Sequence, residues 1–290
     1  MTQRVEEIRI ADGVVAGPLR QSVNQARNIK GSIHNDAVAS KLGFRGGTVA
    51  GSIHLELFAP LLVRVFGEPW FEHGTLSINF KNATTDREPV RAFLDEPSSA
   101  ANVQTRAWVE REDGMLVGEG TASSGETDEV TALQSLDLSR YVAGEPRILA
   151  GLAAGDLIET KEVEMAASVQ DARLDIMTEK LDWYTQSPWG GPIASPATLV
   201  HFLYAYPARV IGRSAGKAVG LFGAIEVRNE SGPLVLDRTY DVGGMILAVG
   251  ESPKTEYLWF ESHASTADGR RIASMRMQLR WMKASSPLYE

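Results

Sequence analysis

The chain repeats itself with a period of about half its length. Residues 46–51 read GGTVAG and precede one apolar run, and residues 190–195 read GGPIAS and precede another, 190 − 46 = 144 positions later in a chain of 290 residues. Further upstream, SVNQAR at 22–27 is echoed by SVQDAR at 168–173. Solenoid repeats are much shorter than this. The repeat therefore predicts two similar domains of about 140 residues each.

Both halves show the same order of elements. Residues 50–66 and 196–211 are apolar with few breaks and too long for typical strands, so each is expected to be a buried helix. Asp113-Gly114 and Asp268-Gly269 stand between strand-like runs and predict hairpin turns. Strands are expected at residues 5–10, 76–80, 90–94, 103–110 and 115–122, and again at 158–165, 219–228, 234–241, 245–249, 256–265 and 271–281.

A single helix that is apolar on nearly all faces must be wrapped by other elements, and an antiparallel meander can supply that wrapping. The expected fold is therefore α+β, a double hotdog in which two curled antiparallel sheets each surround one long helix. We place the domains at residues 1–124 and 156–290, joined by a linker at 125–155 with some helix. Edge-to-edge pairing of the two sheets would remove one exposed edge from each.

Composition narrows the classes of partner. A net charge of −8 argues against nucleic-acid binding through bulk charge, and no apolar run is long enough for a membrane span. The absence of cysteine excludes disulfides, thiolate metal sites and cysteine nucleophiles. The charged first residues do not form a signal peptide. We expect a small-molecule partner and a reducing, cytoplasmic setting.

The loop before the first helix carries the most specific motif. Residues 32–37 read SIHNDA, Gly43-Phe44 follows, and Gly51-Ser52-Ile53 opens the helix. This stretch resembles the MaoC-like dehydratases and (R)-specific enoyl-CoA hydratases, in which an Asn-Pro-Ile-His-x-Asp stretch precedes an Ala/Gly-Phe element and a Gly-led hotdog helix. The match covers about residues 29–62, and later strands match only in pattern.

The resemblance implies a hydro-lyase that hydrates or dehydrates the α,β-bond of an acyl thioester, with His34 as the acid/base. Coenzyme A (CoA) or acyl-carrier pantetheine would be part of the substrate, and no other cofactor is expected. Gly51 and Ser52, at the first turn of the helix, would help to bind the thioester through free backbone N–H groups. Some members of the wider family are subunits of two-chain hydratases, so a homodimer or a partner hotdog subunit is also open.

The family places an Asp five residues before the His, and here that position holds Ile29. Two acids are candidate replacements. Asp36 follows His34 by two residues, where the family often has an acid that supports the loop. Glu56 follows Gly51 by five residues, as does the catalytic acid of the related β-hydroxyacyl-ACP dehydratases. A carboxylate in a buried helix also has a structural explanation, an ion pair with an arginine such as Arg27 or Arg106.

The remaining histidines give weaker signals. His54 is two positions from Glu56 on the helix, points to a different side and is expected to be a buried, hydrogen-bonded histidine. His73, His201 and His263 stand in no recognisable constellation. The histidines take no metal-ligand spacing with acids, so no metal is expected.

The second half reverses the pattern of the first. Tyr184 occupies the place of His34, and Glu179 stands five residues before it, at the family's acid position. The favoured interpretation is a degenerate copy that helps to hold the substrate, with Tyr184 and Trp189 as contact residues. The alternative is a composite site that uses Tyr184 and Glu179.

Three functions follow in order of preference. The first is hydration or dehydration at His34, assisted by Glu56 or Asp36. The second is a thioesterase, isomerase or cyclase on the same fold. The third is a non-catalytic subunit that binds an acyl thioester.

Overall fold

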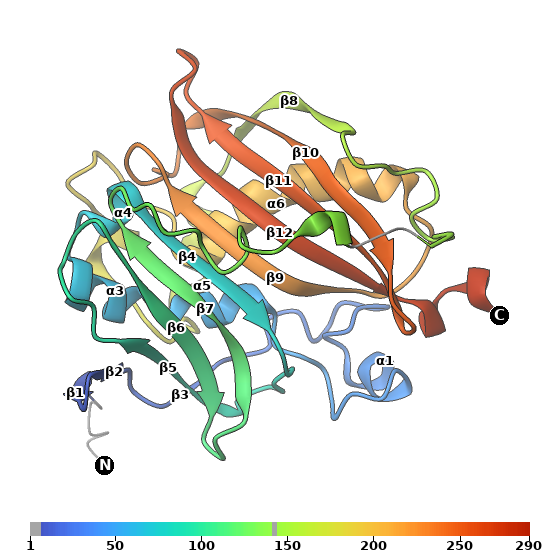
Figure 1. Ribbon diagram of the computed structural model, residues 1–290, viewed down its shortest axis with the longest axis horizontal. Coiled ribbons are helices and arrows are strands. Elements are labelled where there is room, and N and C mark those ends of the chain that lie inside the picture. The colour runs from blue at the N-terminus through green and yellow to red at the C-terminus, as the bar shows by residue number, and fades with distance from the viewer. Residues whose placement is uncertain (1–6, 141–143) are drawn as a thin grey trace.

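Two curved antiparallel sheets meet along one pair of strands and continue as a single sheet (Figure 1). The structure, a computed structural model, describes residues 7–140 and 144–290. Within these residues the 12-stranded sheet has the order β1-β2-β5-β6-β7-β4-β9-β12-β11-β10-β8, with β3 paired to β5. The first half thus supplies one side of the sheet and the second half the other.

The strands of the first half are β1 (Arg9–Ala11), β2 (Val14–Ala16), β3 (Arg20–Gln21), β4 (Gly74–Phe80), β5 (Pro89–Asp95), β6 (Val103–Arg111) and β7 (Leu116–Ser124). Those of the second half are β8 (Leu157–Glu164), β9 (Gly220–Asn229), β10 (Thr239–Glu251), β11 (Thr255–Ser265) and β12 (Arg271–Met282). The helices are α1 (Asp36–Lys41), α2 (Gly51–Glu56), α3 (Ala59–Phe66), α4 (Trp70–His73), α5 (Ala167–Leu174) and α6 (Pro196–Ser214), with 3-10 turns η1 (Leu138–Arg140), η2 (Asp182–Tyr184), η3 (Lys283–Ser285) and η4 (Pro287–Tyr289).

The pairing of β4 with β9 joins the halves, as the sequence predicted for the two sheet edges. It is antiparallel, and its register places Ile78 opposite Ile225 and Leu76 opposite Val227. All four side chains are buried, so the joint is also part of the hydrophobic core. That core is continuous between the halves.

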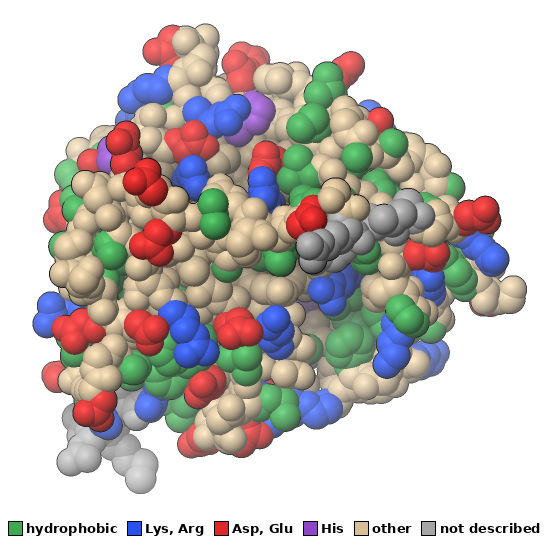
Figure 2. Space-filling model, in the orientation of Figure 1, with side chains coloured by type: hydrophobic (Ala, Val, Ile, Leu, Met, Phe, Trp, Pro, Cys, Tyr) green, Lys and Arg blue, Asp and Glu red, His purple; other side chains and the backbone are tan. Residues whose placement is uncertain are grey.

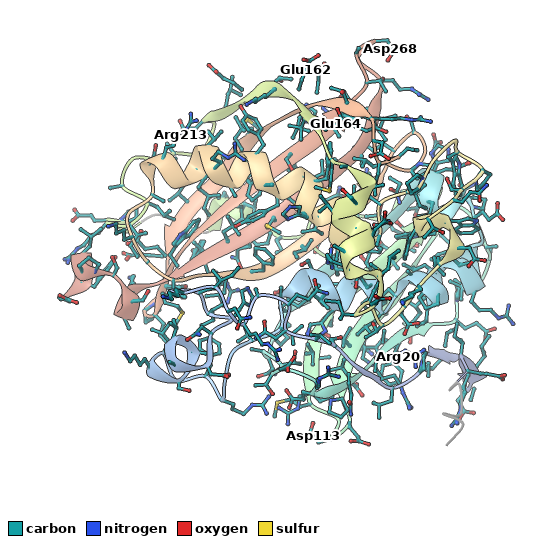
Figure 3. All side chains as sticks on the ribbon, turned by 180° about the vertical axis from the view of Figure 1, so that it is seen from behind. Arg20, Asp113, Glu162, Glu164, Arg213 and Asp268 are labelled. Carbon is teal, nitrogen blue, oxygen red and sulfur yellow. The ribbon has the colours of Figure 1, made fainter. Side chains whose placement is uncertain are left out.

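The predicted hairpins form between β6 and β7 and between β11 and β12. Their tips, marked by Asp113 and Asp268, lie at opposite ends of the molecule in Figure 3. The same view shows α6 lying across the concave face of the second half of the sheet. Each half therefore wraps its sheet round a helix, as the repeat predicted.

The expected helix at 50–66 is divided, whereas its counterpart is not. Pro60 lacks the N–H that would bond the carbonyl of Glu56, and α2 ends there before α3 begins. Pro207 lies inside α6 and leaves the Leu203 carbonyl without its helical donor, yet α6 continues. The Ser262 hydroxyl of β11 donates to that carbonyl at 2.8 Å and takes the place of the missing N–H.

Two strand predictions need correction. Residues 234–241 and 245–249 were expected as separate strands, but β10 is continuous from 239 to 251. Gly243 and Gly244 lie inside this strand. A side chain at Gly244 would lie 2.0 Å from the Glu261 carbonyl oxygen of β11, so glycine is needed there for the two strands to pair. The glycines permit close pairing beside a register shift. Of the strand expected at 5–10, residues 5 and 6 lie outside the described residues, and β1 begins at Arg9.

The linker crosses the outer face of the joint between the halves (Figure 1). Leu133 is fully buried and packs with Trp259 and Ala248, while its N–H donates to Ser77 Oγ of β4. The Thr131 hydroxyl donates to Glu226 of β9. Some helix was expected in this linker, and its described residues contain one 3-10 turn, η1. Because the sheet runs on from one half to the other, the boundaries at 124 and 156 stay a prediction. No helix among the described residues is long and apolar enough to cross a membrane.

Shortening Ile78 to alanine should destabilise the protein by about 2–5 kcal/mol, because the cavity would open in the core at the β4–β9 joint. Denaturant unfolding followed by circular dichroism measures the change. The matched control is Leu157→Ala on the edge strand β8, where the side chain is 73% exposed and the same truncation should cost well under 1 kcal/mol. Equal losses in the two variants would contradict a structural role for the joint.

Candidate active site

A cavity of about 1120 Å³ lies between the two halves. The first half contributes the loop that contains His34, the start of α2, the end of β4 and the start of β7. The second half contributes α6, the start of β9, the β10–β11 turn and the end of β12. Figure 2 shows a hollow with Lys and Arg side chains around it, at the lower right of this face, near where β9 begins and β12 ends. A volume of this size accommodates a large ligand.

His34 lies in the cavity wall with its ring fixed by the backbone. Its Nδ1 lies 2.6 Å from the carbonyl oxygen of Thr48, which can only accept, so Nδ1 carries the hydrogen. Nε2 is then the unprotonated nitrogen of the neutral ring, and no described residue hydrogen-bonds it. A histidine in this tautomer is ready to accept a proton from a molecule in the cavity.

The loop that carries His34 is tied down on both sides. Asn24 Nδ2 donates to the His34 carbonyl at 2.8 Å, and Asp36 accepts the Gly47 N–H at 2.7 Å. A side chain at Gly47 would lie 2.2 Å from the His34 carbonyl oxygen, so only glycine fits. Asp36 is exposed and outside the cavity wall. The structure therefore supports its role in shaping the loop rather than in moving protons.

The charge of the wall is opposite to that of the protein. Lys30, Lys81, Lys254 and Arg280 line the cavity, and none of its described lining residues is Asp or Glu. The whole chain has a net charge of −8. A cavity with basic walls in an acidic protein favours an anionic ligand.

Two further histidines, both overlooked as site residues in the sequence, also line this cavity. His54 of α2 is 2% exposed, its Nε2 lies 2.8 Å from Thr84 Oγ1, and burial lowers its pKa to about 4. His54 was expected to be a buried, hydrogen-bonded histidine. It is buried and its Nε2 is hydrogen-bonded, whereas its Nδ1 has no partner among the described residues. His201 of α6 is exposed on one side, and partial burial of its ring, together with the charge of the nearby Arg173, lowers its pKa.

Glu56 is outside the cavity wall, so the geometry does not support the His34–Glu56 pair. Glu56 is 1% exposed and accepts from the Arg173 guanidinium at 3.2 Å and from Ser195 Oγ at 3.1 Å. Burial raises the pKa of Glu56 to about 7, although Arg173 and Ser195 oppose the shift. The structural explanation, an ion pair, is the one that the geometry supports. The partner is Arg173 rather than Arg27 or Arg106.

The predicted residues of the second half also lie outside the cavity wall. Tyr184 is fully buried, and burial with the charges of Glu56 and Glu179 raises its pKa well above the usual value. Glu179 is engaged by Arg20 at 2.6 Å. Trp189 donates to Glu72 and packs edge-on to Trp183. These contacts fill the position that would correspond to a second site. Of the four residues predicted to bind substrate, Gly51 and Ser52 line the cavity, and Tyr184 and Trp189 do not.

Backbone contacts establish which residues of the two halves correspond. Gln170 Nε2 donates to the Tyr184 carbonyl at 2.9 Å, as Asn24 does to His34. Ala50 and Ser195 are the N-caps of α2 and α6, a separation of 195 − 50 = 145 residues. At this offset of 145 residues, Glu56 corresponds to His201. The glycine motifs are 144 residues apart and would instead pair Glu56 with Val200. This single-residue difference concealed His201.

No group of three His, Asp or Glu side chains within the described ranges is arranged to hold a metal ion. The prediction of a metal-free site rests on the sequence.

Comparison with models of protein families gave no match, and comparison with curated protein sequences gave none either. Solved structures do match along nearly the whole chain. A Chloroflexus aurantiacus protein named for a MaoC dehydratase domain is 12% identical, with a TM-score of 0.60 over 94% of this chain and 95% of the other. A Mycobacterium tuberculosis protein described as a double hotdog is 13% identical, with a TM-score of 0.59 over 94% and 97% of the two chains.

This chain has the double-hotdog fold. The dehydratase domain of PpsC from Mycobacterium tuberculosis, solved with C12:1-CoA, also matches the double hotdog described here, with 11% identity and a TM-score of 0.50 over 94% and 95% of the chains. The fold expected from the repeat and from the resemblance to MaoC-like proteins is thus confirmed. Fold alone does not determine activity, which must be argued from the cavity.

The buried Glu56 gives an expected pH dependence of stability. Its folded pKa of about 7 is above the value of 4.5 for a solvated carboxyl, so between these values the folded state binds more protons than the unfolded state. Its contribution should therefore make the free energy of unfolding fall as pH rises from 4.5 to 7, and Glu56→Gln should remove that fall. Unfolding at a series of pH values measures this fall.

Any catalytic turnover in the cavity should stay within about fivefold of wild type in Glu56→Gln, because Glu56 lies outside the cavity wall. A loss of about 100-fold would restore Glu56 as a catalytic candidate.

Proposed function

We propose that this double hotdog hydrates or dehydrates the α,β-bond of an acyl thioester, with His34 as the group that exchanges a proton with water. The observation that carries the proposal is the position of His34 in a basic cavity between the two halves, with Nδ1 held by the Thr48 carbonyl and an Nε2 that no described residue hydrogen-bonds. The ligand of the PpsC dehydratase domain, an acyl-CoA, supports the class of substrate by fold likeness.

The cavity matches the chemistry of such a substrate. CoA carries phosphates at one end and an uncharged thioester at the other. Lys254 and Arg280 line the part formed by the second half, and His34 lines the part formed by the first. Phosphates held by basic side chains leave the acyl end in the region of His34. Apolar residues such as Phe44, Phe80 and Phe222 also line the cavity and suit an acyl chain.

In the hydration direction, Nε2 of His34 accepts a proton from water while the water oxygen bonds to the β-carbon. The electrons of the double bond move to the α-carbon and the thioester carbonyl, and the α-carbon then takes up a proton to complete the addition of water. The hydrogen bond from Nδ1 to the Thr48 carbonyl stabilises the imidazolium that forms. In the dehydration direction, the same imidazolium returns its proton to the departing hydroxyl.

One observation favours a second candidate, hydrolysis of the thioester. The described wall of the cavity has no carboxylate, whereas the resembling hydratases pair their histidine with an Asp. A water activated by His34 needs no second acid to attack a thioester carbonyl. Release of free thiol from acyl-CoA distinguishes this reaction from hydration. Binding of the thioester with neither reaction would support a non-catalytic role.

Replacing His34 with glutamine should reduce hydration by about 100- to 10,000-fold, since the group that accepts the proton from water is lost. The measurement is the loss of conjugated-thioester absorbance with a panel of trans-2-enoyl-CoA substrates of different chain lengths. His73→Gln is the matched control, because His73 lies outside the cavity wall and bonds the Glu230 carbonyl. Turnover of the His34 variant at the wild-type rate would remove the central residue of the proposal.

Reversing the charge of Lys254 should weaken binding of the phosphorylated end alone. Lys254→Glu is expected to raise KM for acyl-CoA about tenfold, since a phosphate would meet a like charge. It should leave KM for the matching N-acetylcysteamine thioester, which has no phosphate, unchanged. Lys180→Glu, on an exposed lysine paired with Asp175 outside the cavity wall, serves as the control. An equal effect on both substrates would show that Lys254 does not contact the phosphates.

A further inference from the structure

Addition of water to an enoyl thioester requires two proton transfers. His34 serves the oxygen on the β-carbon, and another group must deliver a proton to the α-carbon. In the resembling family an Asp shares this work, but Ile29 stands at that position and lines the cavity with an exposed side chain. The described wall offers no carboxylate in its place. The missing partner must therefore come from another residue of the wall.

The candidates in the wall are few. His54 is nearly inaccessible, is engaged by Thr84 and is neutral at ordinary pH because burial lowers its pKa to about 4. Tyr204 is half-buried, and burial raises its pKa, which makes it a poor base. Lysines keep their protons near neutral pH and cannot accept one from carbon. His201 is exposed in the wall and can exist in both protonation states.

The internal symmetry gives independent support for His201. In the filled second site, Glu56 on α2 of the first half accepts a hydrogen bond from Ser195, at the end of the loop of the second half that contains Tyr184. The helix residue of one half therefore lies against the loop of the other. His201 corresponds to Glu56 and His34 to Tyr184, so the same relation places His201 opposite His34. Both residues line the one cavity, as this relation requires.

We propose that His201 is the second catalytic residue, exchanging a proton with the α-carbon while His34 exchanges one with the β-hydroxyl. This inference rests on the proposed function. In dehydration, a ring nitrogen of His201 accepts the α-proton, the C–H electrons form the double bond, and the β-C–O bond breaks. The departing hydroxyl takes a proton from His34 and leaves as water. Both histidines return to their starting states by exchange with solvent.

The surroundings of His201 suit the role of base. Partial burial of the ring lowers the pKa of His201, and the charge of Arg173 on α5 lowers it further, which favours the neutral ring over the imidazolium. Arg173 is itself held by Glu56 and by Gln25, next to the Ala26 that lines the cavity. Arg173 therefore donates to Glu56 in the filled second site, while its charge acts on His201 in the wall of the open one.

The test is a comparison of His201→Gln, His34→Gln and Tyr204→Phe with the wild-type protein. His201→Gln should lower kcat for dehydration of a 3-hydroxyacyl-CoA about 100-fold or more with KM within threefold. Deuterium at the α-carbon should slow His201→Gln more than the wild type, because proton removal from carbon becomes rate-limiting. The isotope effect should not increase in His34→Gln, in which departure of the hydroxyl is impaired instead.

Chemical rescue separates proton transfer from a structural role. His201→Ala should recover at least tenfold in kcat when imidazole is added, since the cavity admits a small base, while His263→Gln outside the wall should behave as wild type in all assays. Wild-type kcat in His201→Gln, lack of rescue, or a larger loss in Tyr204→Phe would overturn the assignment while leaving His34 and the reaction intact. A wild-type protein that neither hydrates enoyl-CoA nor dehydrates its product would overturn both proposals.

Discussion

The pairing of β4 with β9 determines how the two halves face each other, and the cavity depends on it. An antiparallel pair with a defined register allows little freedom between the sheets, so α2 and α6 meet at their N-terminal ends, where Ile53 packs with Ala197. Each loop that precedes a helix then lies against the helix of the other half. The proposed site is for this reason composite, with His34 from one half and His201 from the other.

The two symmetry-related places have opposite electrostatics. One is open and bordered by basic side chains, and its described wall has no acid. The other is filled, and it contains the buried carboxyl groups of Glu56 and Glu179, each held by an arginine. The acids of the filled place therefore lie outside the wall of the open cavity. Arg173 of the second half holds Glu56 of the first, so this ion pair also links the two halves.

Local features of the sequence predicted most of the fold and only part of the site. Hairpin turns and alternating strands are local patterns, and both hairpins and most of the predicted strands formed, while the strands expected at 234–241 and 245–249 are the single strand β10. The division at Pro60 could have been read from the sequence. The intact helix at Pro207 could not, because it depends on Ser262 of a distant strand. His34 was found through its motif. His201, which also lines the cavity, was missed because the one-residue difference in offset concealed it and because contacts between halves leave no local pattern.

The covalent connection of the halves has a consequence for evolution. In a homodimer of single hotdogs, one codon specifies the helix residue at both places, and an acid cannot be present at one without appearing at the other. Here the position is encoded twice, as Glu56 and as His201, and the two copies are free to diverge. An ion pair that links the two halves and an imidazole that lines the cavity therefore coexist at equivalent places, which no symmetric assembly of identical chains can achieve.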